Sequence, residues 1–424
     1  MSSVRPLNGR QLTVAIVSQV YVPDPASVGQ YMADAAEELA QRSHHVVVFT
    51  SARGYDDPSA RYPRRERRDG VEIRRLPASW FGKGSITRRL LGSLAFVAQA
   101  TARVLSLPRL DVLLVSTSPP LAPLVALVVR LLRRTPVVYW VMDLNPDQLI
   151  AVRGVSPRAR TVRLFEWLNR RILSAAGEVV VLDRFMAERV RAKRDMNGKL
   201  RVIPLWPHEQ HVAPVVGDAN PFRTHHAPAD TIVVMYSGNH SPANPLDTVL
   251  QAAERLRGDG RFLFMFVGGG LGKRAVDAAA GGNVVSLPYQ ALQEIRYSLS
   301  AADIQIVTLG DGVVGVVHPS KIYAAMAAGR PVLYVGPRPS HVTDLIDAGG
   351  IGWTFAHGDV DGIVCALRRL ADGRAELVDT GQRALELART RFSKASLCGT
   401  FCDGIEALAE PANVSPAVHA RDTV

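Results

Sequence analysis

The sequence predicts an α/β protein of two domains, each with a parallel sheet wrapped by helices. Three observations support this fold class. Apolar runs of strand length alternate with segments of helical length in both halves of the chain, which is typical of βα units. A proline-rich segment without periodicity, 205–221, interrupts the alternation and is the best linker candidate. A length of 424 residues also suits two or three domains of ordinary size.

The first half contains seven strand candidates, which are short and mostly apolar. They lie at 13–20, 44–51, 70–77, 111–117, 136–143, 178–183 and 200–205. Helices are expected between them, at 30–42, 83–107, 160–176 and 184–193, with another after 117. The arginine-rich segment that ends near Asp69 has no such pattern, so it is predicted to be a loop.

A second βα series begins after the linker. Its strands are expected at 231–238, 262–269, 283–288, 303–309 and 331–336, with helices that include 248–257 and 321–328. The last helical segment, 394–410, is expected to pack back across the linker. We therefore predict two Rossmann-like domains, 1–207 and 208–390, facing each other across a cleft, and a third part, 391–424, made of that helix and a disordered tail after Pro411.

Composition narrows the classes of partner. The net charge of +11 favours anionic partners, and a low aromatic content of 6% argues against single-stranded nucleic acid. Three cysteines indicate a reducing compartment without a disulfide framework, and the first residues lack the layout of a signal peptide. The apolar stretch 112–132 is interrupted by two prolines, so we expect a strand and a buried helix there instead of a membrane span.

A lysine on the first turn of a short helix is the first candidate site residue. Ser320 is a candidate N-cap for the helix that starts at Lys321, and Gly329 with Pro331 would end it. Helix N-termini carry partial positive charge, so a lysine there is unfavourable unless an anion lies opposite both the helix end and the lysine. A phosphate group would fit, and a solvated surface lysine is the alternative.

The turns after the first strand of each half are candidates for phosphate binding. The first contains only Gly29, so the G-x-G-x-x-G fingerprint of nicotinamide dehydrogenases is absent. Gly238 and Asn239 mark the equivalent turn of the second half. Ligands of open α/β sheets lie at the carboxyl ends of the strands, where the Gly238 turn and Lys321 are expected to converge on one diphosphate. The glycine-rich segment 267–273 lacks P-loop spacing and is predicted to be a tight turn.

Asp143 directly follows a predicted strand, where catalytic residues often lie, although capping of the next helix is an alternative role. His208 and His211 form an H-E-Q-H pair in the linker. A proline-rich linker is not a helix that aligns two imidazoles on a metal, so we predict no metal site there.

Basic residues gather in the first half, at Arg61, Arg64, Arg65, Arg67, Arg68, Lys83, Arg88 and Arg89. The segment 80–100 mixes basic residues with tryptophan, phenylalanine and leucine, which is the composition of an interfacial membrane helix. A core helix with one solvated face is the alternative. The arginine-rich loop favours an anionic membrane surface, because each basic residue near one contributes about 1 kcal/mol.

Several motifs together resemble family 4 glycosyltransferases, in particular the bacterial branch that builds extracellular polysaccharide and O-antigen repeats. They are PASVGQYMADAAEELAQRSHHV, DLNPD, YSGN and HPSKIYAAMAAGRPVLYVG, with a final helix after RF, and the resemblance covers nearly the whole chain. It implies a GT-B fold and retaining transfer of a sugar from a nucleotide-diphosphate donor, with UDP-sugars favoured and without a metal or other cofactor. The C-terminal half would hold the donor, and the N-terminal half an acceptor such as a polyprenyl-diphosphate-linked sugar.

The resemblance also implies roles for individual residues. Asp143 and Lys321 would be catalytic, and the donor-binding residues would be Gly29, Gly238, Asn239, Gly315, Pro319, Ser320, Lys321 and Tyr323. The chain departs from the family pattern where relatives carry two glutamates, because Val316 and Ala324 occupy those positions. Two other functions remain open: a nucleotide-sugar epimerase on the same scaffold, and a non-catalytic, membrane-associated subunit, which the missing glutamates suggest. The enzyme is expected in the cytoplasm, at the inner face of the cell membrane.

Overall fold

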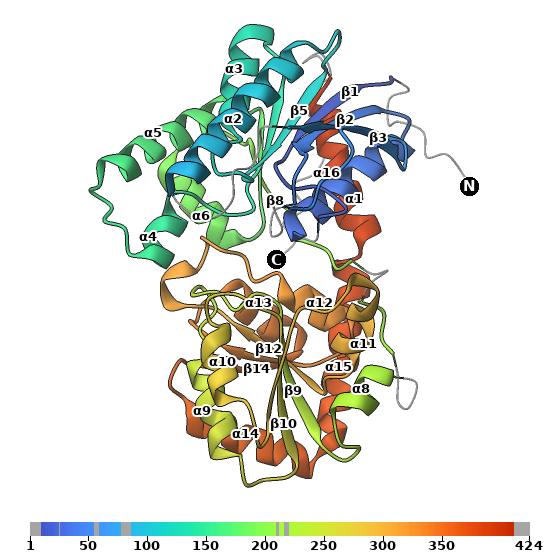
Figure 1. The fold of residues 1–424 in the computed structure, drawn as a ribbon, viewed down its shortest axis with the longest axis vertical. Coiled ribbons are helices and arrows are strands. Elements are labelled where there is room, and N and C mark those ends of the chain that lie inside the picture. The colour runs from blue at the N-terminus through green and yellow to red at the C-terminus, as the bar shows by residue number, and fades with distance from the viewer. Residues whose placement is uncertain are drawn as a thin grey trace.

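The structure, a computed structural model, describes residues 10–24, 26–54, 59–77, 86–208, 212–215 and 220–410, which form two α/β domains (Figure 1). The N-terminal domain contains an eight-stranded sheet with the order β3-β4-β2-β1-β5-β6-β7-β8. The C-terminal domain contains a six-stranded sheet with the order β11-β10-β9-β12-β13-β14. All neighbouring strands are parallel except β3 and β4. The fold class predicted from the sequence is therefore confirmed.

The strands of the N-terminal domain are β1 (Thr13–Val17), β2 (His45–Ser51), β3 (Arg65–Arg68), β4 (Val71–Leu76), β5 (Val112–Ser116), β6 (Val137–Trp140), β7 (Glu178–Val181) and β8 (Leu200–Val202). Its helices are α1 (Ser27–Gln41), α2 (Ile86–Leu105), α3 (Leu124–Arg133), α4 (Asp147–Arg153), α5 (Arg160–Ala175) and α6 (Arg184–Lys193). The central strands β1 and β5 are buried along their whole length, as expected for a parallel sheet covered on both faces.

The strands of the C-terminal domain are β9 (Ile232–Ser237), β10 (Phe262–Val267), β11 (Val284–Leu287), β12 (Ile304–Thr308), β13 (Val332–Val335) and β14 (Gly352–Phe355). The α-helices after the linker are α8 (Pro221–His226), α9 (Asp247–Arg255), α10 (Lys273–Ala279), α11 (Ile295–Ser300), α12 (Lys321–Ala327), α13 (His341–Gly349), α14 (Val360–Asp372), α15 (Arg374–Arg391) and α16 (Lys394–Leu408), with 3₁₀ turns at Leu292–Glu294 and Asp311–Val313.

The arginine-rich segment before Asp69 contains strand β3, where the sequence predicted a loop. Its four residues, RERR, lack the apolar alternation of a half-buried strand, and three of them are exposed. They nevertheless pair antiparallel with β4, in the register Arg65 with Arg74 and Arg68 with Val71. A short, charged strand at the edge of a sheet is a common way to prevent edge-to-edge association, so its composition fits its position.

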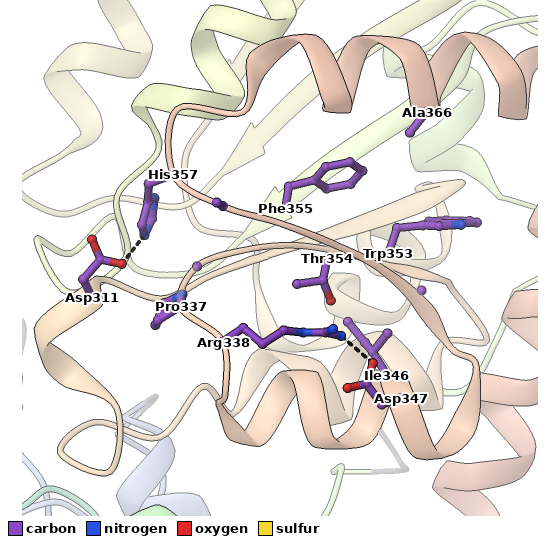
Figure 2. Close-up of a pocket in the computed structure, with 13 residues that line it drawn as sticks. Asp311, Pro337, Arg338, Ile346, Asp347, Trp353, Thr354, Phe355, His357 and Ala366 are labelled. Atoms are coloured by element: carbon purple, nitrogen blue, oxygen red, sulfur yellow. Dashed lines mark hydrogen bonds and ion pairs between the residues drawn. The ribbon is translucent and has the colours of Figure 1, made fainter.

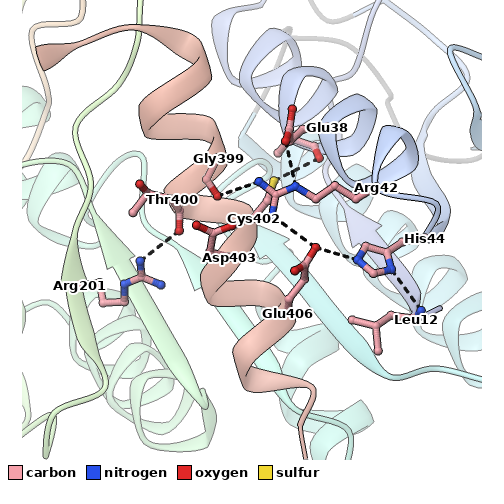
Figure 3. A network of polar contacts seen from close by, with 11 residues as sticks. Leu12, Glu38, Arg42, His44, Arg201, Gly399, Thr400, Cys402, Asp403 and Glu406 are labelled. Atoms are coloured by element: carbon pink, nitrogen blue, oxygen red, sulfur yellow. Dashed lines mark hydrogen bonds and ion pairs between the residues drawn. The ribbon is translucent and has the colours of Figure 1, made fainter. Parts of the chain in front are cut away.

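The last helix, α16, lies against the N-terminal domain, although it follows the C-terminal domain in sequence (Figure 1). Phe401 packs on Trp140 with ring centroids 4.2 Å apart. Figure 3 shows the polar contacts at this junction: Arg42, the C-cap residue of α1, bonds Asp403 at 2.6 Å, and Glu406 lies 2.9 Å from His44. The predicted disordered tail after Pro411 lies outside the described residues.

Asp34 of α1 anchors the linker and the start of α16 to the N-terminal domain. The carboxylate of Asp34, only 5% exposed, accepts hydrogen bonds from Trp206 Nε1 at 2.8 Å and from Lys394 Nζ at 2.5 Å, and His208 Nδ1 lies 3.1 Å away. These contacts lower the pKa of Asp34 even though burial opposes its ionisation. A buried carboxylate with this many donors fixes the path of the chain between the domains.

Candidate active site

Lys321 and the turn after β9 come together at the carboxyl end of the C-terminal sheet. Lys321 Nζ donates to the hydroxyl of Tyr236 and to the carbonyl oxygen of Asn239, the latter at 3.2 Å, and lies 4.0 Å from the centroid of the Tyr236 ring. Gly238 has φ +129°, and a Cβ atom there would lie 2.5 Å from Lys321 Cε. The glycine therefore makes room for the lysine side chain.

Three basic side chains, Lys321, His240 and Lys273, lie near one another at this end of the sheet. Burial lowers the pKa of Lys321 to about 7. The neighbouring His240 is fully buried, and its pKa falls to about 4 through burial and the charges of Lys273 and Lys321. The pKa of Lys273 is also lowered by burial. An anion bound here would reverse part of these shifts, because it would favour the charged forms.

The first turn of α12 differs from the capping geometry that the sequence predicted. Ser320 holds the N-cap position, but its side chain makes no capping hydrogen bond. The amides of Ile322 and Tyr323 donate to the carbonyl oxygens of Pro319 and Ser320, at 3.3 and 3.2 Å. Since these two amides are already engaged, the lysine ammonium is the stronger anion-binding group at this helix end.

The loop that leads into Lys321 docks onto the N-terminal domain. Asp143 and Val317 form an antiparallel bridge, and the amide of Leu144 donates to the carbonyl oxygen of Val316 at 3.0 Å. Gly315 has φ +69°, and a Cβ there would lie 2.6 Å from the carbonyl oxygen of Phe185. This glycine allows close contact between the two domains, and its predicted role in donor binding stays a prediction.

Asp143 follows β6 and does not cap the next helix, because the N-cap residue of α4 is Pro146. The capping alternative is therefore wrong. Burial raises the pKa of Asp143 to about 6, and the charge of His318 opposes this rise. A carboxyl group with a pKa near neutrality at the domain interface suits proton transfer or the orientation of a hydroxyl group.

The remaining predicted donor-binding residues lie deeper in the structure. Pro319 is buried, and Tyr323 is fully buried, with its hydroxyl 2.8 Å from a nitrogen of each of His318 and His341. Gly29 lies in the first turn of α1, where a Cβ would come within 3.0 Å of the Tyr21 backbone. Gly29 thus has a packing reason to be glycine, and its phosphate-binding role stays a prediction.

The two positions at which relatives carry glutamates hold apolar residues in this chain. Val316 is 1% exposed and belongs to the interdomain loop, and Ala324 is half-buried on α12. Among the described residues, no group of three or more histidines, cysteines or acids is arranged to hold a metal ion. His208 contacts Asp34 instead, and His211 lies outside the described residues.

A cavity of about 780 Å³ lies elsewhere in the C-terminal domain (Figure 2). It opens beside the edge strand β14, between α13 and α14. Arg338 and Asp347 form an ion pair at one side of it, and His357 and Asp311 lie at another. Neither Lys321 nor the Gly238 turn lines this cavity, so it is separate from the candidate site.

Comparison with known proteins identifies the family. Residues 27–206 match the sequence model of the glycosyl transferase 4-like domain, and residues 231–373 match that of the glycosyl transferases group 1. The chain belongs to the family 4 glycosyltransferases. The resemblance predicted from its motifs is therefore confirmed, and the two facing α/β domains are the GT-B fold.

Two relatives of this glycosyltransferase come from bacteria. WbjE of Pseudomonas aeruginosa, described as a probable glycosyltransferase, is 30% identical over 63% of the chain, and the match spans 66% of that protein, just under two thirds. WcaI of Escherichia coli (strain K12), named for colanic acid biosynthesis, is 24% identical over 82% of the chain and 89% of that protein.

Two solved structures share the fold. Sucrose-phosphate synthase from Thermosynechococcus elongatus has a TM-score of 0.76 at 18% identity, covering 94% of the chain and 99% of that structure. HepE of Anabaena in complex with UDP and glucose has a TM-score of 0.69 at 16% identity, covering 94% and 100%. At these identities the likeness shows the fold alone.

Sequence reasoning missed three polar residues at the site of the glycosyltransferase: Tyr236, His318 and Asp183. The motif HPSK contains His318, and Asp183 follows a strand and precedes a helix, so both carried a local signal. Their pairing, with His318 Nδ1 2.7 Å from Asp183 Oδ2, joins residues 135 positions apart and has no signature in the sequence.

Proposed function

We propose that the chain is a retaining, metal-independent glycosyltransferase that moves a hexosyl group from a nucleotide-diphosphate-sugar to a lipid-linked or other glycan acceptor. The observation that carries the proposal is the convergence of Lys321 with the Gly238–Asn239 turn at the carboxyl end of the C-terminal sheet. UDP-sugars are the favoured donors, because HepE, which shares the fold, has been solved with UDP and with UDP-glucose.

In the proposed reaction, the bond between C1 of the sugar and the diphosphate oxygen breaks as an acceptor hydroxyl approaches the same face. Negative charge then grows on the leaving diphosphate, and the Lys321 ammonium stabilises it. Removing one such positioned donor typically costs about 2.7–4 kcal/mol of transition-state stabilisation. The acceptor hydroxyl loses its proton to the leaving phosphate oxygen, so atoms and charges balance.

Asp143 is the proposed partner on the acceptor side. Its backbone pairs with Val317, four residues before Lys321, so the carboxyl group and the ammonium come from adjoining segments of the two domains. With a pKa of about 6, the carboxyl group is mostly ionised at pH 7 and can accept a hydrogen bond from an acceptor or sugar hydroxyl.

We propose that the acceptor is reached at the cytoplasmic face of an anionic membrane, through the layer formed by α2, α3 and α5. Helix α3 packs against both neighbours. Segment 78–142 contains eight basic residues and only one acid, Asp111. The layer exposes large apolar side chains, namely Leu90, Leu91, Leu94, Leu131, Leu132, Leu164 and Trp167.

Apolar side chains among arginines fit a lipid interface, because the leucines enter the headgroup region while the arginines meet anionic lipids. Trp167 has the Arg171 guanidinium 5.3 Å from its ring centroid, which is one local example of this mixture. Trp80, Phe81 and Lys83 lie outside the described residues. Within the described residues, no helix combines the length and the apolar character needed to cross a bilayer.

The test is transfer from radiolabelled nucleotide-sugars to polyprenyl-diphosphate-linked acceptors, with and without EDTA, for the wild type and Lys321→Ala. The proposal predicts EDTA-insensitive transfer with retained anomeric configuration and loss of turnover in the variant. Full turnover by Lys321→Ala at saturating donor would contradict it.

Two other functions give different outcomes. An epimerase would convert the nucleotide-sugar without any acceptor, which incubation with the donor alone would reveal. A non-catalytic subunit is suggested by the apolar residues Val316 and Ala324, and it should bind no UDP, GDP or nucleotide-sugar in calorimetry.

A further inference from the structure

A chain of four side chains crosses the domain interface next to Lys321. It begins at Asp183, between β7 and α6 of the N-terminal domain. His318 Nδ1 lies 2.7 Å from Asp183 Oδ2, and His318 Nε2 lies 2.8 Å from the hydroxyl of Tyr323. The same hydroxyl lies 2.8 Å from His341 Nε2. The last three residues all belong to the C-terminal domain.

The first two members of the chain are almost completely inaccessible, since the side chains of His318 and Asp183 are 1% and 3% exposed. Asp183 Oδ1 accepts a hydrogen bond from the amide of Met186 at 2.8 Å, so both carboxylate oxygens are used. Burial opposes ionisation of Asp183, but its bonds to His318 and Met186 and the nearby imidazoles lower its pKa to about 2. A buried charge of this kind is tolerated only while its partners stay in place.

The hydrogen bonds of the chain are mutually consistent. With a proton on His318 Nδ1, that nitrogen donates to Asp183, and Nε2 accepts from the Tyr323 hydroxyl. The hydroxyl oxygen then accepts from His341 Nε2, and His341 is neutral because burial lowers its pKa to about 3. Each bond therefore has one donor and one acceptor, and the loss of any member leaves a buried polar group unpaired.

His318 is also three residues before Lys321, in the loop that docks on the N-terminal domain. That loop makes other interdomain contacts, including a 2.6 Å bond from Arg189 Nε to the carbonyl oxygen of Val314. These contacts are made by the backbone of the loop. His318 differs because its side chain contacts the buried carboxylate of Asp183 in the N-terminal domain. The position of Lys321 is thus tied to whether Asp183 and His318 are in contact.

We propose that His318 is a positioning residue: its bond to Asp183 couples contact between the two domains to the placement of the Lys321 ammonium on the donor diphosphate. The catalytic part of this inference, the placement of Lys321 on the diphosphate, rests on the proposed function. Its structural part, that the pair holds the domains together, stands without it. Neither residue touches the reacting atoms, so the effect is transmitted through the loop 314–320.

The interface provides a matched control. Arg184, the residue after Asp183, bonds Asp344 of α13 at 2.6 and 3.0 Å and also joins the two domains. This pair is exposed, at 52% and 36%, so water screens it and replaces it easily. Arg184→Ala removes an interdomain ion pair one residue away without disturbing the buried chain.

The experiment measures the distance between the domains with spin labels on Cys365 of α14 and on an introduced cysteine, Ala102→Cys, of α2. Cys365 and Ala102 are exposed, while Cys398 and Cys402 are buried, so labelling is selective. The variants are Asp183→Asn, His318→Ala and His318→Asn, whose side-chain amide can replace the Nδ1–H donor, together with Arg184→Ala.

We expect broadened distances for Asp183→Asn and His318→Ala, and distances like those of the wild type for His318→Asn and Arg184→Ala. In steady-state assays, kcat/KM for the donor should fall at least tenfold in the first two variants and less than threefold in the other two. A double variant that combines Asp183→Asn with His318→Ala should be no worse than either single variant, because the two residues act as one unit.

Unchanged distances and kinetics in His318→Ala, or additive losses in the double variant, would overturn the proposal. If His318→Ala or Asp183→Asn fails to fold, His318→Asn still tests the proposal, because distances broader than those of Arg184→Ala would overturn it. If the wild type shows no transfer to any acceptor while the distances behave as expected, the proposed function fails and the interdomain role of His318 stands.

Discussion

The lowered pKa of Lys321 makes donor binding a proton-linked event. In the free protein, burial holds this pKa at about 7, so about half of the ammonium groups are neutral at pH 7. A diphosphate placed against Nζ favours the charged form and raises the pKa in the complex. Binding above pH 7 must therefore take up a proton.

The size of the effect follows from the fraction of neutral lysine. At pH 8, one unit above the pKa, about 0.9 of the groups are neutral, so each binding event should take up close to one proton. The sign is fixed by the direction of the shift: affinity is fully present below pH 7 and is lost as the pH rises. Between pH 6 and pH 8 the dissociation constant should increase about tenfold, equivalent to about 1.4 kcal/mol.

Calorimetry in two buffers with different ionisation enthalpies measures the proton uptake directly. An intact nucleotide-sugar is the appropriate ligand, because its diphosphate does not titrate in this range. Lys321→Met should abolish the uptake, whereas Lys273→Met, which removes a neighbouring cation, should retain it. No uptake by the wild type at pH 8, or an unchanged uptake in Lys321→Met, would refute the placement of the diphosphate.

Three further predictions concern other parts of the structure. Gly238→Ala should weaken nucleotide-sugar binding at least tenfold in calorimetry, because its Cβ would lie 2.5 Å from Lys321 Cε, whereas Gly258→Ala, with nothing within 4 Å, should bind normally; equal affinities would contradict this. Asp143→Asn should abolish transfer yet raise the free energy of unfolding at pH 8 by up to about 3 kcal/mol, since a pKa raised by about two units makes burial of the charged form costly. This gain should shrink as the pH falls from 6 to 4 in urea titrations, and a pH-independent difference would count against it. Leu131→Glu and Trp167→Glu should reduce co-sedimentation with anionic vesicles several-fold, whereas Leu271→Glu, at an 84% exposed leucine of the C-terminal domain, should not.

The sequence predicted the sheets well because parallel strands buried on both faces are continuous apolar runs. The runs around β1, β5 and β12 are of this kind, and each is fully buried. Strand β3 was not predicted, because its arginines are exposed at a sheet edge and give no apolar pattern. The same rule explains why β14, a half-buried edge strand of four residues, was not predicted.

At the site, local pattern indicated the right segments but not their partners. The motif around Lys321 and the Gly238 turn could be predicted to lie close together, because the carboxyl ends of parallel strands meet at one edge of the sheet. That Tyr236 would bond the ammonium, or that Ser320 would make no capping bond, depends on side-chain packing that sequence spacing does not encode. His318 and Asp183 required the relative placement of the two domains.

The proposed catalysis requires the donor diphosphate to lie against Lys321. A crystal structure with a bound nucleoside diphosphate tests it directly. We predict a phosphate oxygen about 3 Å from Lys321 Nζ, beside the Gly238 turn. A nucleotide bound with its diphosphate away from Lys321, for example in the cavity beside β14, would contradict it.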